Sequence, residues 1–83
     1  MNQSILLAIK DEAFRAQERY GYFASTHEAL GVLAEEWDEL RDAIRANDLA
    51  AIEREAIQVA AVAARLAEHC RARQLPFVER SGG

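Results

Sequence analysis

The chain of 83 residues has room for one small domain, whose core supplies only about 3–5 kcal/mol without a disulfide, a metal or a partner chain. Half of its residues (51%) are hydrophobic, which excludes general disorder. Its net charge of −4 comes from interleaved acidic and basic residues, which excludes the basic stripe that a nucleic-acid polymer requires.

Ala, Glu, Leu and Arg dominate the composition, and because these are strong helix formers we expect an all-α fold. The single cysteine, Cys70, excludes an internal disulfide framework, and its place in an apolar stripe predicts a small core residue. The first residues lack the basic lead and the apolar run of a secretory signal. No run approaches the roughly 18 apolar residues of a membrane span. We therefore expect a cytoplasmic protein with no membrane partner.

The first predicted helix runs from Gln3 or Ser4 to Tyr20, followed by Gly21 as a left-handed C-terminal cap. Apolar residues recur along it at the spacing of one helix face, at Leu6, Ile9, Ala13, Ala16 and Tyr20. The loop that follows, residues 21–24, is rich in aromatic side chains and not polar, so we expect it to pack against another surface, which the sequence does not identify.

The second predicted helix opens at Ser25, which together with Glu28 matches a capping box. We expect it to end at Asn47, with Asp48 capping the next helix. A stripe of large apolar residues predicts the side of the helix that faces the core, at Leu30, Leu33, Trp37, Leu40 and Ile44.

The third predicted helix runs from Leu49 to Arg73 or Gln74 and is closed by Pro76. Its middle, residues 56–64, is apolar on nearly every side, with Gln58 as the one polar interruption. Two neighbouring helices cannot surround such a segment, so we expect a partner subunit. The prediction is thus one helical domain over residues 1–76, followed by a flexible tail over 77–83.

Acidic residues on the second and third helices form the most informative pattern in the sequence. Glu36 and Glu39 lie three residues apart and share a helix face, and Glu55 and Gln58 repeat this spacing. If the two helices form an antiparallel hairpin about Asn47 and Asp48, both pairs lie at the same level. The sequence therefore predicts that three acids and one amide converge at the edge of the core.

Converging carboxylates repel one another, and burial penalises their charged forms, so their pKa values rise unless a cation intervenes. A hard cation such as Mg²⁺ takes oxygen ligands from carboxylates together with substrate phosphates. Two less specific interpretations remain open. The acids can form a solvated helix face, and Gln58 can be a hydrogen-bonded core amide.

These residues resemble the MazG-like, all-α nucleoside triphosphate pyrophosphohydrolases. The resemblance rests on Glu35-Glu36-x-x-Glu39, followed by Glu55-x-x-Gln58, and it covers about residues 4 to 70. It implies Mg²⁺-dependent hydrolysis, with Mn²⁺ as an alternative cofactor, of a (deoxy)nucleoside triphosphate to monophosphate and pyrophosphate. It also implies a homodimer or homotetramer whose helices form four-helix bundles, with the active site near the interface.

The resemblance assigns roles residue by residue. Glu36, Glu39, Glu55 and Gln58 fall on the metal-binding positions, and Glu35 joins Glu36 and Glu39 as a catalytic candidate with a supporting or water-activating role. The family usually has Asp where this chain has Gln58, which removes one negative charge. The alternative is therefore a non-catalytic helical oligomerisation or nucleotide-sensing module on the same scaffold.

Candidates for contacting the nucleotide lie on the first helix. Family members often place residues that contact phosphate and base there, and the basic residues at corresponding places are Lys10, Arg15 and Arg19. Their spacing is irregular, so the competing interpretation is a solvated surface. Trp37 lies on the apolar stripe, and we interpret it as a packing residue rather than a base-stacking one.

Overall fold

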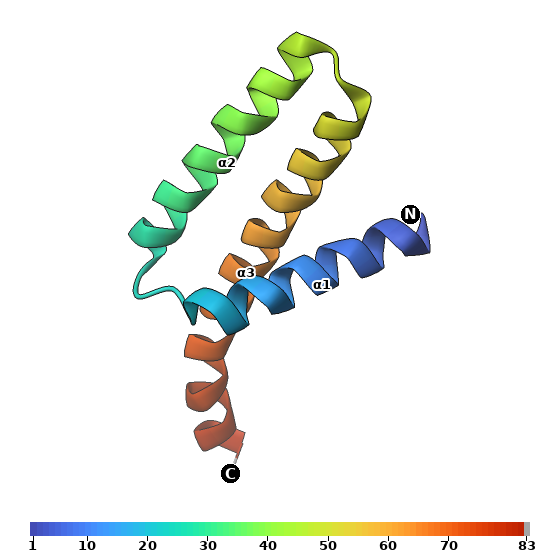
Figure 1. Cartoon of the computed structure of the whole chain (residues 1–83). Helices are drawn as coiled ribbons and strands as arrows, with labels where there is room; N and C mark the ends of the chain where they lie inside the picture. The colour runs from blue at the N-terminus through green and yellow to red at the C-terminus, as the bar shows by residue number, and fades with distance from the viewer. Residues whose placement is uncertain (83) are drawn as a thin grey trace.

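The computed structural model describes the backbone of residues 1–82 and the side chains of residues 1–74. The all-α fold is confirmed, because three helices account for nearly all of this part of the chain: α1 (Gln3–Tyr20), α2 (Thr26–Ala46) and α3 (Leu49–Gly82). In Figure 1, α2 and α3 lie side by side as a long hairpin, and α1 crosses α3. The predicted antiparallel hairpin is thus also confirmed.

The ends of α1 are set by local signals. The side chain of Asn2 caps its start by accepting the N–H groups of Ser4 (2.7 Å) and Ile5 (3.3 Å). At its end, the N–H of Gly21 donates to the carbonyl of Gln17. Gly21 has a φ of 76°, as the predicted cap requires, but its ψ of −169° extends the chain instead of continuing a left-handed turn. The chain therefore leaves α1 directly for α2.

The predicted capping box of α2 is confirmed. Ser25 Oγ accepts the N–H of Glu28 (3.1 Å), while the Glu28 carboxylate accepts the N–H of Ala24 (2.8 Å). At the other end, Asn47 adopts the left-handed conformation with a φ of 57°, and Asp48 caps α3 through the N–H of Ala51. This two-residue turn fixes the register between the helices and hence the level at which their side chains meet.

The helices pack as two pairs, α2 with α3 and α1 with α3, and α1 does not contact α2. The interior is small: Phe23, Ala29 and Val62 form its buried cluster, with partly buried residues packed around them, namely Val32, Leu33 and Leu66. Phe23 comes from the aromatic loop, which confirms that this loop packs against the helices. On α1, no residue is fully buried, and two members of its predicted stripe, Leu6 and Tyr20, are exposed.

The predicted core stripe of α2 is wrong for three of its five residues, whereas Leu33 packs against the buried cluster and Leu40 is half-buried. Leu30, Trp37 and Ile44 are 60%, 55% and 52% exposed. Instead, α2 turns a neighbouring stripe of small residues toward α3, with Ala29 and Ala43 both buried. Small side chains let two helix backbones approach closely, so the larger stripe is displaced to the side of the hairpin.

The predicted end of α3 at Arg73 or Gln74 is also wrong, because the helix continues through Pro76 to Gly82. A proline in a helix removes one backbone hydrogen bond and clashes with the preceding turn. This proline belongs to the C-terminal part of α3, the part that projects beyond the other two helices (Figure 1). The side chains of 75–83 lie outside the described residues, and the flexibility of the tail over 77–83 stays a prediction.

The protomer is more open than a compact domain of its length. Its radius of gyration is 15.0 Å, whereas about 12 Å is expected for a compact chain of this size. Within the described part of the chain, none of the helices has a stretch long and apolar enough to cross a lipid bilayer. The openness follows from the projecting end of α3 and from the lack of contact between α1 and α2.

Candidate metal centre

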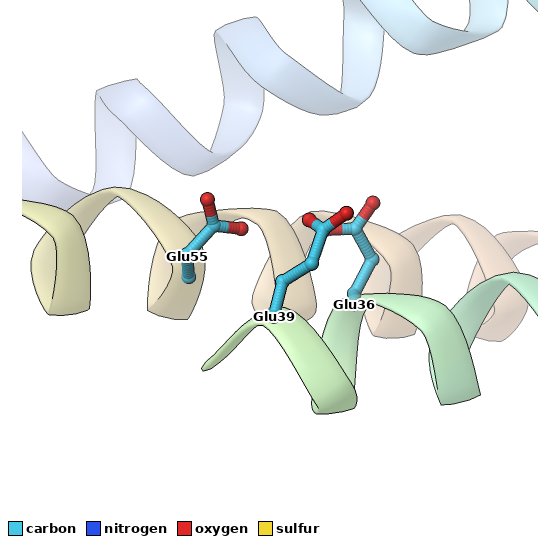
Figure 2. A group of neighbouring side chains, drawn as sticks. All are labelled: Glu36, Glu39 and Glu55. Atoms are coloured by element: carbon cyan, nitrogen blue, oxygen red, sulfur yellow. The ribbon is translucent and has the colours of Figure 1, made fainter. Parts of the chain in front are cut away.

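Three glutamates meet where α2 and α3 run side by side. Glu36, Glu39 and Glu55 each offer a carboxylate oxygen, and these oxygens all lie within 4.8 Å of one another. In Figure 2 the three side chains rise from the two helices toward the side on which α1 crosses. The predicted meeting of the Glu36 and Glu39 pair with Glu55 is therefore confirmed. The cause is the turn at Asn47 and Asp48, which sets these residues at one level.

The protein environment disfavours the charged forms of two of these groups. Burial raises the pKa of Glu36, and the nearby negative charges of Glu39, Glu55 and Glu35 raise it further. Burial also raises the pKa of Glu55, as do a hydrogen bond with Glu39 and its charge, while Arg54 acts in the opposite direction. Burial and neighbouring negative charge thus disfavour the charged forms of Glu36 and Glu55, which is the situation that a bound cation would relieve.

Two carboxylate oxygens of the cluster are buried without a hydrogen-bond partner, Glu36 Oε2 and Glu55 Oε2. Buried hydrogen-bond acceptors in proteins nearly always have a partner. Two buried acceptors without a partner in one cluster therefore require an explanation. The nearest positive group is weakly placed, since Arg54 Nε lies 3.9 Å from Glu55 Oε1 on an exposed side chain. Among the described residues, the two oxygens therefore have no hydrogen-bond donor to compensate for their burial.

A cleft of about 510 Å³ opens beside the cluster and is bounded by all three helices. Its polar wall includes Glu35, Glu36 and Gln58, and its apolar wall includes Val32 and Val62. Gln58 lies one turn beyond Glu55 on α3 and lines the same cleft as Glu36. Of the three clustered glutamates, Glu36 alone is in the lining, so this residue joins the cluster to a space large enough for a phosphate chain.

The structure does not bring the three predicted nucleotide-contacting residues together. Lys10 lines a separate groove between α1 and α3, on the other side of α1 from the acidic cleft. Arg15 pairs with Glu12 at 3.6 Å and borders a smaller hollow that also reaches Gln58. Arg19 lies over the ring of Tyr20, 5.5 Å from its centroid. Of the three, only Arg15 shares a hollow with a predicted metal-site residue.

Sequence reasoning missed two residues of the cleft, Arg65 and Glu12. Arg65 is only 8% exposed, and it donates from Nε to Gln17 Oε1 and from Nη2 to the carbonyl of Gly21, both at 3.1 Å. Its guanidinium also lies over the ring of Phe23, 4.3 Å from the centroid. The available signal was an arginine directly after the apolar run of residues 56–64, seven residues after Gln58 and hence on the same helix face.

Comparison with known proteins identified no relative. No family model matches the chain, and neither a curated protein nor a solved structure is significantly similar to it. Functional inference therefore depends on the geometry of the carboxylate cluster and the cleft.

Proposed function

We propose that this protein is a Mg²⁺-dependent nucleotide pyrophosphohydrolase, which converts a (deoxy)nucleoside triphosphate to its monophosphate and pyrophosphate. The observation that carries the proposal is the meeting of Glu36, Glu39 and Glu55 within 4.8 Å of one another, with two buried oxygens left unpaired. A solvated acidic face would instead present its carboxylates to water. We also propose a homodimer or homotetramer in the cytoplasm, as the sequence predicts.

The donor set suits a hard divalent cation. Mg²⁺ binds through carboxylate oxygens, keeps several waters and shares substrate phosphates, and Mn²⁺ accepts the same ligands. When bound by these three glutamates, it would supply charge stabilisation to the phosphate oxygens. Gln58 contributes an amide oxygen from the adjoining wall of the cleft, at the position where an acid would add a further negative charge.

The remaining residues of the cleft have separable roles in this proposal. Glu35 lies on the cleft wall and is exposed, so its carboxylate can accept a proton from a water molecule. That water forms the new P–O bond at the α-phosphorus, and the bond to the pyrophosphate oxygen breaks. Arg65 provides a positive charge on the same wall, which favours the phosphate chain over a neutral ligand.

A second candidate function is a non-catalytic module that binds a nucleotide or a metal, or that only assembles. The amide of Gln58 favours it, because one negative charge fewer near the cluster weakens the hold on a cation. Such a module would bind without turnover. The same cluster and cleft serve both candidates, so only a measurement of reaction separates them.

The proposal is tested by incubating the purified protein with individual nucleoside triphosphates and Mg²⁺ or Mn²⁺, and by measuring released pyrophosphate. We expect turnover that chelation abolishes, and a loss of at least about 100-fold in Glu36→Gln, because even residues that only support a metal ligand commonly contribute 10- to 100-fold. Asp38→Asn, on the exposed side of α2, is the matched control. A folded protein without turnover on any nucleotide would remove the enzymatic claim.

Gln58→Asp separates a weakened enzyme from a binding module. The added carboxylate should tighten Mg²⁺ binding by roughly tenfold, because a unit charge a few ångströms from the cation acts in a medium of intermediate dielectric. Isothermal titration with Mg²⁺ measures this change, and the pyrophosphate assay measures turnover in the same samples. Tighter binding with no turnover favours the module, whereas turnover gained or increased identifies the enzyme.

A further inference from the structure

The attachment of α1 to the hairpin is the weakest part of the packing. No residue of α1 is fully buried, and α1 contacts α3 but not α2. An open hollow lies on each side of it, a groove of about 700 Å³ on one side and the acidic cleft of about 510 Å³ on the other. Apolar contact has no preferred direction, so it does not fix how far α1 is rotated toward either hollow. Setting that rotation requires directional contacts.

Arg65 supplies these directional contacts. Among residues 1–74, two side-chain hydrogen bonds join α1 and its cap to the hairpin, and Arg65 donates both of them, from Nε to Gln17 Oε1 and from Nη2 to the carbonyl of Gly21. The ion pairs of this part of the chain all lie within single helices, so none of them joins α1 to the hairpin. The polar attachment of α1 therefore depends on one side chain.

The guanidinium of Arg65 is buried without an acidic partner. Arg65 is buried, and none of the described carboxylates forms an ion pair with it. Burying a charge is unfavourable unless polar contacts compensate for the lost water. Here the compensation comes from the two neutral oxygens and from the ring of Phe23, which packs with Ala29 and Val62 in the interior. The guanidinium thus connects α1 and the loop to the interior of the hairpin.

The rotation of α1 matters because α1 forms one wall of the acidic cleft. Glu12, Ala16 and Tyr20 line this cleft, and their four-residue spacing places them on one face of α1. Gln17 lies on a neighbouring face and lines the groove on the other side of α1 instead. A rotation of α1 that broke the bond between Arg65 and Gln17 would also move the three cleft residues relative to the carboxylates of α2 and α3.

We infer that Arg65 is a positioning residue, whose two directed hydrogen bonds hold α1 at the rotation that sets the width of the acidic cleft. This role is separate from the positive charge of Arg65, because lysine keeps the charge but lacks the planar fork that donates to two oxygens while stacking on a ring. The attachment of α1 stands whether or not the cleft binds a ligand, whereas its consequence for a nucleotide rests on the proposed function.

Hydrogen exchange tests the attachment in the free protein. Arg65→Lys and Gln17→Leu should each speed amide exchange along α1 by at least about tenfold, because each removes a hydrogen bond to a charged group. Exchange in α2 between Ala29 and Ala43 should stay within about twofold of the parent. Gln3→Leu makes the same change at an exposed glutamine of α1 and is the matched control. If Arg65→Lys does not fold, Gln17→Leu decides alone, and parent-like exchange along α1 in that variant would overturn the inference.

Ligand titration separates positioning from a general loss of stability. The three clustered glutamates come from α2 and α3, so folded Gln17→Leu should bind Mg²⁺ alone with the affinity of the parent. If α1 is correctly placed in only about one tenth of the molecules, the apparent affinity for a ligand that touches both walls falls about tenfold. The probe is the α,β-methylene analogue of the nucleotide that the pyrophosphate assay turns over, titrated with saturating Mg²⁺.

The possible results of the titration are distinct. A weakened affinity for the analogue with unchanged Mg²⁺ binding supports the positioning role, and equal losses for both ligands contradict it. If the parent turns over and binds no nucleotide, the proposed function fails, and the exchange measurement still decides whether Arg65 holds α1 in place.

Discussion

The two faces of the α2/α3 hairpin are built from the same two helices and have opposite chemistry. The side toward α1 gathers three glutamates, two of which have raised pKa values because burial and neighbouring charges disfavour ionisation. The other side carries the large apolar stripe of α2 and leaves three of its side chains, Leu30, Trp37 and Ile44, in solvent. Each face is therefore unfavourable in the isolated protomer, for opposite reasons. One lacks positive charge, and the other lacks apolar cover.

The interior between these faces buries too little apolar area to compensate for the unfavourable energies of both faces. Among residues 1–74, whose side chains the structure describes, the buried hydrophobic residues are Phe23, Ala29, Ala43, Ala61 and Val62, and three of the five are alanines. Small residues bring the helices close but bury little apolar area each. The comparison teaches that α2 leaves three large apolar residues, Leu30, Trp37 and Ile44, on the surface and buries two small ones, Ala29 and Ala43. Most of its stability should then come from what the two faces bind.

The largest effect should come from breaking the interior that both faces share. Phe23→Ala removes the ring that packs between Ala29, Val62 and the guanidinium of Arg65. A buried Phe→Ala change typically costs about 3–5 kcal/mol, which is comparable to the whole stability of a domain of this size. We expect loss of the cooperative melting transition by circular dichroism. Tyr22→Ala, at an exposed neighbour, should stay within about 0.5 kcal/mol of the parent.

A smaller effect should follow from loosening the turn that aligns the two faces. Asn47 holds a left-handed conformation, which costs about 1–2 kcal/mol for an ordinary residue such as alanine. Asn47→Ala should therefore lower the free energy of unfolding by roughly 1 kcal/mol in urea titrations, whereas Asn47→Gly should leave it nearly unchanged. Equal losses in the two variants would show that the backbone conformation at this position is not what matters.

Sequence reasoning predicted the features that depend on local signals. The caps at Ser25 and Asp48 and the turn at Asn47 follow from side chains that bond to the nearest backbone. Once those were placed, counting from the turn was enough to bring Glu39 level with Glu55. The carboxylate cluster was predictable because it needs only helix period and one turn.

The features that could not be predicted from the sequence depend on which side of a helix packs inside the protomer. Periodicity shows that α2 has a large apolar stripe ending at Ile44, but it cannot tell whether that stripe is buried within the chain or between copies. The small residues Ala29 and Ala43 lie on the side of α2 that contacts α3, because small side chains allow the two helices to approach more closely. Likewise, the role of Arg65 could not be predicted from the sequence, because its side chain donates to the carbonyl of Gly21, a loop residue 44 positions away.

The subtlest prediction concerns the charge of the carboxylate face in metal-free protein. The pKa values of Glu36 and Glu55 in the folded state are raised above the ordinary value of 4.5, so the folded state binds more protons than the unfolded state. Their contribution is most favourable below that value and is lost as pH rises through the raised pKa values. Between pH 4.5 and neutrality, metal-free protein should thus lose a few degrees of melting temperature relative to Glu36→Gln.

Adding Mg²⁺ should reverse this slope, and the reversal distinguishes a metal centre from a merely crowded set of acids. Protons and a cation compete for the same carboxylate oxygens, so stabilisation by Mg²⁺ should grow as pH rises. Differential scanning fluorimetry of the parent and Glu36→Gln, each with Mg²⁺ and with chelator, measures all four slopes. Only in the parent should the slope of melting temperature against pH change sign when Mg²⁺ replaces the chelator. If Mg²⁺ shifts both proteins equally, the cation acts elsewhere on the acidic surface, and the cluster is a solvated face whose repulsion α2 and α3 simply tolerate.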